Sequence, residues 1–340
     1  MLQLINHTPY KATIAVFPNE QAVDCLYIML KATFSIGEQI AVAQEQLPIV
    51  MADEYWGDPG QSSLKYASEY HLVKPFTDIV MVGSACAPGK QAVEALDVQL
   101  GVGQYYKTVR VFGERRWITG MIGLDVSRPA PFESMPLVYE RAFGGVHDPE
   151  DKKTPLSYEA ANPVGVGFMG NRKPEEMKGM PLPNLEDPAQ LIKKPNDRPS
   201  PAGVGFIAPA WAPRIHYAGT YDDQWNKKRA PYLPEDFDSR FFNSASSGLV
   251  CQSYLKGGEP VTMVNMSPDG PLQFNLPAAV LEARVRIAGD TRTPSLNLET
   301  VLLEPNERRF ALLWRAMVVC GKQPLKAEEI HIGQKQLNLN

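Results

Sequence analysis

Short runs of apolar, β-branched and aromatic residues recur along the first 128 residues, separated by turn-forming residues. These runs are "KATIAVF" (11–17), "VDCLYIMLKATFSI" (23–36), "TDIVMVGSA" (77–85) and "VEALDVQLGV" (93–102). "KTVRVFGERRWI" (107–118) places Gly113 between two alternating arms, which predicts a hairpin. Because no run shows a convincing period of 3.6 residues, the pattern predicts antiparallel strands, most simply in a sandwich.

The last third of the chain returns to the same pattern. "EPVTMVNM" (259–266) predicts one strand, and "LEARVRIAG" (281–289) alternates apolar with charged residues, as a half-exposed strand does. "LNLETVLLEPNERRFALLWRAMVV" (296–319) predicts a long hairpin with "PNE" at its bend.

The middle of the chain differs in composition, because it is rich in proline. Residues 129–213 hold 15 of the 30 prolines, and proline fixes φ and lacks a backbone donor. Long helices and central strands are therefore not expected here, although buried-type residues such as Phe168, Phe206 and Trp211 predict an ordered layer. One short helix is predicted over 187–193, with Asp187 as its N-cap.

These patterns predict a mainly β protein, with an antiparallel sandwich-like scaffold, a large ordered Pro/Gly-rich irregular region and few short helices. The expected parts are a β-rich N-terminal part (1–128), a Pro/Gly-rich part (129–245) and a β-rich C-terminal part (246–340). Whether they form one continuous domain or more stays open at this level.

Two glycine-rich stretches raise the question of nucleotide binding. "PVGVGFMG" (163–170) fits G-x-G-x-x-G, and "PAGVGFIA" (201–208) fits the looser form that ends in alanine. A dinucleotide site needs a strand before the glycines and a helix after them, but prolines flank both stretches. We interpret them as tight loops whose phenylalanines enter the core, and we expect no cofactor.

Composition and charge narrow the function classes. The net charge of −4 and the absence of a basic stripe argue against nucleic-acid binding. The chain starts without a secretory signal and has no apolar run of about 18 residues, so we expect a cytoplasmic protein without membrane contact. The four cysteines lie far apart, which predicts buried thiols and no metal site.

Catalytic motifs are sparse. There is no G-x-S-x-G motif, and the five histidines are isolated in the sequence. The remaining enzymatic alternative is a carbohydrate-active or other hydrolase with paired carboxylates, drawn from Glu133, Glu140, Asp222 and Asp223.

The middle segment resembles a bacterial family, long described as of unknown function, that accompanies type VI secretion clusters. The resemblance rests on ordered blocks: "PFESMPLVYERAFGG" (131–145), "NPVGVGF" (162–168), "LPNLEDP" (182–188), "RPSPAGVGFI" (198–207), "WAPR" (211–214), "GTYDDQW" (219–225), "LPEDFDSRFFNSA" (233–245) and "GGEPV" (257–261). It implies a non-enzymatic adaptor or chaperone that binds a toxic effector, often one with a PAAR domain, and helps load it on the VgrG spike.

If the chain is such an adaptor, aromatic and arginine side chains of the middle segment are the expected contacts, because these residue types dominate interface energetics. The candidate partner-binding residues are Tyr139, Arg141, Trp211, Arg214, Tyr221, Trp225, Arg240 and Phe241. We also expect two ion pairs within the layer, Glu140 with Arg141 and Asp238 with Arg240.

Overall fold

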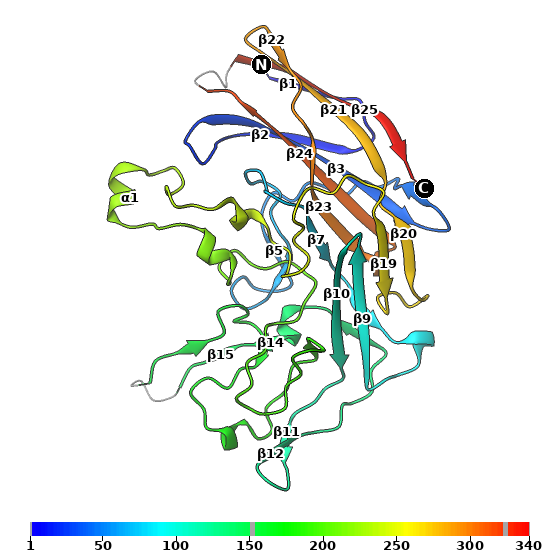
Figure 1. Cartoon of the computed structure of the whole chain (residues 1–340), viewed down its shortest axis with the longest axis vertical. Helices are drawn as coiled ribbons and strands as arrows, with labels where there is room; N and C mark the ends of the chain where they lie inside the picture. The colour runs from blue at the N-terminus through cyan, green and yellow to red at the C-terminus, as the bar shows by residue number, and fades with distance from the viewer. Residues whose placement is uncertain (1, 150–153, 322–325, 340) are drawn as a thin grey trace.

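The largest sheet joins strands from both ends of the chain (Figure 1). The computed structural model describes residues 2–149, 154–321 and 326–339. The strands of this sheet run in the order β2-β3-β24-β23-β7, with β4 paired to β3: β2 (Lys11–Pro18), β3 (Asp24–Ile36), β4 (Ile40–Val42), β7 (Asp78–Met81), β23 (Asn297–Glu304) and β24 (Arg309–Val319). All neighbours are antiparallel except β7 and β23, which are parallel.

Two further sheets complete the scaffold. One has the order β18-β10-β9-β19-β20: β9 (Ala95–Val102), β10 (Tyr105–Phe112), β18 (Leu185–Glu186), β19 (Pro260–Val264) and β20 (Leu272–Asn275). The other has the order β1-β25-β21-β22: β1 (Gln3–Asn6), β21 (Ala278–Ile287), β22 (Asp290–Arg292) and β25 (Ala327–Asn338). The fold is mainly β, with mostly antiparallel sheets in a sandwich-like arrangement, as predicted.

One hydrophobic cluster connects the three sheets. It includes Leu30 from β3, Val98 from β9 and Ile330 from β25, all fully buried. The strand β3 is buried along almost its whole length, which explains its nearly continuous apolar sequence. All four cysteines are free thiols and buried, as the sequence predicts.

The hairpin predicted over 296–319 is confirmed. β23 and β24 pair antiparallel, and the bend is the short 3-10 helix η6 (Pro305–Glu307). Arg308 follows it in the left-handed region, with φ 52°, and closes the turn.

The hairpin predicted over 107–118 is wrong. β10 instead pairs with the preceding β9, and the turn between them falls at Gly103, where φ is 58°. The second predicted arm forms β11 (Trp117–Thr119), which pairs with β12 (Leu124–Val126). Gly113 leaves β10 where a Cβ would lie 1.7 Å from the carbonyl oxygen of Ala130, so close backbone approach explains this glycine.

Short pairings and single 3-10 turns fill the Pro/Gly-rich part and the nearby loops. The remaining strands are β5 (Glu54–Tyr55), β6 (Leu64–Tyr66), β8 (Ser84–Cys86), β13 (Ser134–Pro136), β14 (Phe143–Gly144), β15 (Val146–His147), β16 (Ser157–Tyr158) and β17 (Val166–Gly167). The 3-10 helices are η1 (Pro88–Lys90), η2 (Tyr139–Arg141), η3 (Pro174–Met177), η4 (Arg214–Tyr217) and η5 (Ser239–Phe242).

This irregular part is packed rather than loose. Phe168 enters a second cluster with Trp117, Phe143 and Met177, whereas Phe206 enters the main core. Both phenylalanines of the glycine-rich stretches are therefore buried, as interpreted from the sequence.

The helix predicted over 187–193 is wrong. The Asp187 carboxylate accepts a hydrogen bond from the backbone N–H of Ala189 (2.8 Å), but this bond caps a turn and not a helix. The buried carboxylate of Glu186 accepts the backbone N–H of Ile192 (2.8 Å) and draws the segment back on itself. Within the described residues the α-helical segment is α1 (Asp223–Lys228), whose N-cap is Asp222.

Buried charges join the largest sheet to the irregular layer. Asp78 on β7 is fully buried, and its carboxylate accepts bonds from Lys74 Nζ (2.7 Å), Asn243 Nδ2 (2.9 Å) and the Ser244 backbone N–H (2.8 Å). A charge removed from water this completely is tolerated only when its partners are in place.

We expect the substitution Asp78→Asn to destabilise the chain strongly, because it removes the carboxylate that pairs with the buried Lys74 ammonium. Breaking a buried ion pair typically costs about 3–5 kcal/mol of unfolding free energy. Urea unfolding followed by tryptophan fluorescence measures this change. Asp269→Asn is the matched control, because it removes the exposed pair with Arg308 (3.0 Å) and should cost under about 1 kcal/mol. Equal losses in the two variants would contradict the prediction.

Candidate functional site

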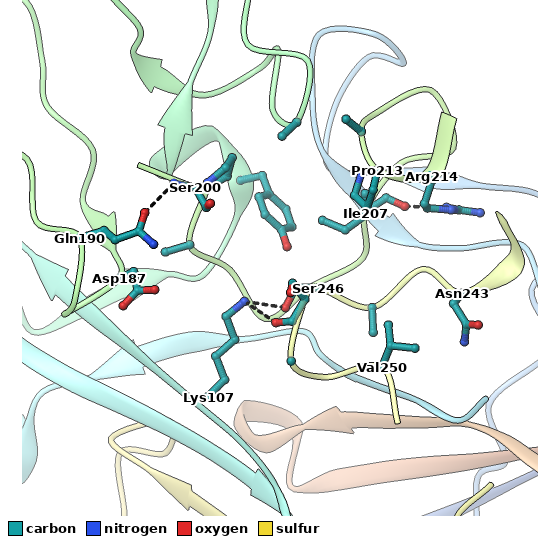
Figure 2. A pocket seen from close by; sticks show the side chains of 18 of the residues that line it. Lys107, Asp187, Gln190, Ser200, Ile207, Pro213, Arg214, Asn243, Ser246 and Val250 are labelled. Carbon is teal, nitrogen blue, oxygen red and sulfur yellow. Dashed lines mark hydrogen bonds between the residues drawn. The ribbon is translucent and has the colours of Figure 1, made fainter. Parts of the chain in front are cut away.

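A cavity of about 920 Å³ lies between β10 and the Pro/Gly-rich layer. Figure 2 shows Asp187, Gln190 and Ser200 at one end, Arg214 and Asn243 at the other, and the Lys107 side chain between them. The lining comes from segments far apart in the sequence: 106–108, 187–190, 200–202, 212–217 and 243–250. Its volume is that of a site for a small molecule or a short peptide.

Lys107 projects from β10 into this cavity. Its Nζ donates to Ser246 Oγ (2.9 Å) and to the Ser247 carbonyl oxygen (3.1 Å). Burial lowers the pKa of the Lys107 amine to about 8, and the nearby Asp187 carboxylate offsets part of this effect. Ser246 Oγ in turn donates to the Gly203 carbonyl oxygen (2.9 Å).

Tyr139 lines the same cavity and is buried. Its ring packs edge-on against Trp211, with centroids 5.7 Å apart. Its hydroxyl lies beside Ser246 but forms no hydrogen bond of good geometry among the described residues. Burial raises the pKa of this hydroxyl, and Ser246 offsets part of the effect. A Cβ at Gly203 would lie 2.6 Å from Cζ of Tyr139, so this glycine lets the backbone pass directly against the tyrosine ring.

The first glycine-rich stretch packs against the chain directly after Tyr139. β17 pairs with β14 in parallel, and a Cβ at Gly165 would lie 2.6 Å from the Ala142 carbonyl oxygen. The two stretches therefore flank one segment, residues 139–144, and neither leads directly into an α-helix. Close backbone approach explains these glycines.

A second cavity of about 570 Å³ lies beside residues 136–141. Arg141 Nη1 donates there to Glu114 Oε1 (2.9 Å) and to Asn184 Oδ1 (3.0 Å). Glu140 instead accepts from the Ser63 backbone N–H and from Ser63 Oγ, both at 2.6 Å. The predicted Glu140–Arg141 pair is therefore wrong, whereas the Asp238–Arg240 pair is confirmed.

Residues 214–242 form a lobe that carries α1 and extends away from the sheets (Figure 1). Within the lobe, the Asp236 carboxylate accepts hydrogen bonds from the Thr220 backbone N–H (2.9 Å) and from Thr220 Oγ1 (2.7 Å). These bonds join the two ends of the segment that carries α1. Tyr221 packs edge-on against Trp225, with centroids 4.7 Å apart, and Tyr221 is 54% exposed.

The eight predicted partner-binding residues divide by exposure. Tyr139 and Trp211 are buried, and Tyr221 and Arg240 are exposed. The other four are half-buried: Arg141, Arg214, Trp225 and Phe241. Five of the eight lie in the lobe, where Arg214 also stacks over Phe241 and donates from Nε to its carbonyl oxygen (2.9 Å). Tyr139 lines the large cavity, as do Arg214 and Arg240 of the lobe, and Trp211 packs against Tyr139. Arg141 lines the smaller cavity.

Sequence reasoning missed Lys107 and Ser246. One signal for Lys107 was available: it shares a strand face with Val109 and Val111, which are buried, so it occupies an inward position of an alternating strand. Ser246 carries no comparable signal, because its position depends on the distant contact of its neighbour Ser244 with Asp78.

The carboxylates considered for hydrolysis are dispersed. Of Glu133, Glu140, Asp222 and Asp223, only Glu140 lines either cavity. Asp222 accepts the Trp225 backbone N–H (2.8 Å) as a helix cap. Over the described ranges, no three His, Cys, Asp or Glu side chains are grouped as metal ligands. The same ranges contain no helix with the length and apolar character needed to span a bilayer.

Comparison with known proteins yields one match. The model of a family described as "Uncharacterized protein conserved in bacteria (DUF2169)" matches residues 21–315, a span that contains both cavities and the lobe. No curated protein and no solved structure matches the chain.

Gly203→Ala should destabilise the chain by roughly 1–3 kcal/mol, because its Cβ would overlap a tyrosine ring that Trp211 holds in place. Thermal and urea unfolding measure this loss. Gly333→Ala on β25 is the control, because no atom lies within 4 Å of the added Cβ, and its effect should stay within about 0.5 kcal/mol. A neutral Gly203→Ala variant would show that Tyr139 is free to move.

Stability should rise with pH between about 8 and 10.5 because of Lys107. The pKa of its amine is about 8 in the folded chain and 10.5 for an ordinary lysine, so in this window the unfolded chain binds the extra proton. Lys107→Met should remove this contribution. The measurement is the difference in urea midpoint between wild type and Lys107→Met at pH 7.5 and at pH 9.5. A difference that does not change with pH would contradict the prediction.

Proposed function

The chain belongs to the DUF2169 family of proteins conserved in bacteria, and from this premise we propose that it is a cytoplasmic adaptor for a type VI secretion effector. In this role it binds an effector, commonly one with a PAAR domain, and helps place it on the VgrG spike. The ordered sequence blocks between 131 and 261 that resemble such adaptors lead to this proposal.

The observation that carries the proposal is the clustering of the expected contact residues. Five of the eight lie on the lobe formed by residues 214–242, which stands clear of the sheets in Figure 1. Ile215, Tyr221 and Tyr232 are 44%, 54% and 40% exposed there. Exposed aromatic and arginine side chains gathered on one projection suit a protein–protein contact.

A second projection supports the same type of function. The turn between β11 and β12 carries Met121 and Ile122, which are 102% and 95% exposed. Two adjacent apolar side chains at a hairpin tip gain stability only when another surface covers them. The proposed adaptor therefore has two separate apolar contacts to offer.

Co-purification tests the proposal. The chain is expressed with a PAAR-containing effector and the VgrG protein encoded in the same bacterium, and we expect a complex with the effector. Deleting the gene for this chain should abolish secretion of that effector. An effector that neither binds the chain nor depends on it for secretion would refute the adaptor role.

Tyr221→Ala should weaken effector binding by roughly 30-fold, the effect of losing a contact worth about 2 kcal/mol at an interface. Circular dichroism checks that the fold is kept, and titration calorimetry gives the Kd. Tyr158→Ala is the control, because Tyr158 is 56% exposed but lies on β16, outside the lobe. Unchanged affinity for Tyr221→Ala would exclude Tyr221 from the contact without affecting the co-purification result.

A further inference from the structure

Lys107 differs from the two buried lysines of the core. Lys31 Nζ lies 2.7 Å from Glu69 Oε1, and Lys74 Nζ lies 2.7 Å from Asp78 Oδ2. Lys107 Nζ contacts only a hydroxyl and a carbonyl oxygen, and in the described part of the chain it forms no ion pair. An ammonium group has three N–H donors, so one donor remains for a group inside the cavity.

A second donor lies at the same place. The Tyr139 hydroxyl is buried beside Ser246 and forms no hydrogen bond of good geometry among the described residues. Ser246 Oγ, which accepts from Lys107, donates to the carbonyl oxygen of Gly203. Ser246 therefore lies beside both the Lys107 ammonium and the Tyr139 hydroxyl, on the wall that Gly203 continues.

Unpaired buried donors indicate what the cavity is built to receive. A buried hydroxyl without a good hydrogen bond costs free energy, and so does a partly buried ammonium whose nearby carboxylate, Asp187, forms no ion pair with it. One incoming group with two acceptor oxygens and a negative charge would satisfy both donors. A carboxylate has this composition.

The charge around the cavity favours a single negative charge. Its titratable and cationic lining consists of Tyr106, Lys107, Tyr139, Asp187, Arg214, Tyr217 and Arg240. In Figure 2 Arg214 lies at the far end, where it donates to the Ile207 carbonyl oxygen, and Asp187 lies on the side of Lys107. One ammonium beside one carboxylate suits a monoanion better than a phosphate dianion, because the second charge would repel Asp187.

We propose that this cavity is a carboxylate-binding site, in which the Lys107 ammonium pairs with the carboxylate of a ligand and the Tyr139 hydroxyl donates to it. The volume of about 920 Å³ accommodates more than the carboxylate itself, so the ligand is either a free organic acid or the C-terminal end of a peptide. The proposal does not depend on the adaptor role, because it rests on the donors of the cavity alone.

The test measures the pKa of the Lys107 amine by NMR in the wild-type chain, labelled with ¹⁵N at lysine Nζ. The Lys107→Met variant identifies the signal of Lys107, because that signal is missing from its spectrum. Acetate is the probe, because it presents the carboxylate and nothing else, and sodium chloride at the same ionic strength is its control. Saturating acetate should raise the pKa of Lys107 by about one pH unit, the effect of an opposite charge at contact distance. The exposed Lys178 serves as the internal control, and its signal should not distinguish acetate from chloride.

Identical Lys107 titrations in acetate and in chloride would overturn the proposal. Tyr139→Phe should weaken acetate binding by roughly fivefold, the effect of one lost hydrogen bond; unchanged affinity would remove Tyr139 from the site. Hexanoate and an N-acetylated tripeptide, the latter as free acid and as C-terminal amide, separate the two sources. A peptide ligand requires that the free tripeptide bind more tightly than hexanoate and that the amide fail. A free organic acid as the ligand requires that hexanoate bind more tightly than the free tripeptide.

Discussion

The buried carboxylate of Asp78 is the constraint on which the rest of the structure depends. It lies on β7 within the largest sheet and accepts from Lys74, Asn243 and Ser244. Lys74 belongs to the loop before β7, whereas Asn243 and Ser244 lie more than 160 residues further along the chain. One ionised group therefore fixes the position of the irregular layer on the sheet, because misplacing either segment would leave a charge buried without partners.

The large cavity follows from this attachment. Ser246 and Ser247 follow Asn243 and Ser244, which bind Asp78, after one intervening residue, and they accept hydrogen bonds from the Lys107 side chain of β10. The second glycine-rich stretch closes the same wall, since Gly203 lets its backbone pass against Tyr139. The site is thus assembled from a strand, two loops and a buried ion pair, each held by contacts made elsewhere.

The surfaces that remain free include exposed apolar side chains. Some exposed apolar side chains lie on the strands, such as Val280 and Met317, but the two most exposed, Met121 and Ile122, form the β11–β12 tip. The lobe of residues 214–242 adds Ile215, Tyr221 and Tyr232. The lobe is held to the scaffold by polar backbone contacts, among them the bond from Arg229 to the Glu20 carbonyl oxygen. A rigid scaffold with separate projections is an arrangement suited to binding, since loops can vary without disturbing the core.

The sequence by itself determined the fold class, long strands such as β2, β3, β9 and β21, and the hairpin of β23 and β24, because alternation and turn residues act between near neighbours. It also identified the glycine-rich stretches as loops with buried phenylalanines. The predicted helix at 187–193 failed because Glu186, which is buried and paired with Arg115, accepts the Ile192 backbone N–H and turns the segment back. The predicted hairpin at 107–118 failed because β10 pairs with the strand before it, β9, and not with the residues after Gly113. Only the tertiary structure placed Lys107, Tyr139 and Ser246 around one cavity, because burial and charge at such a site depend on segments more than 100 residues apart.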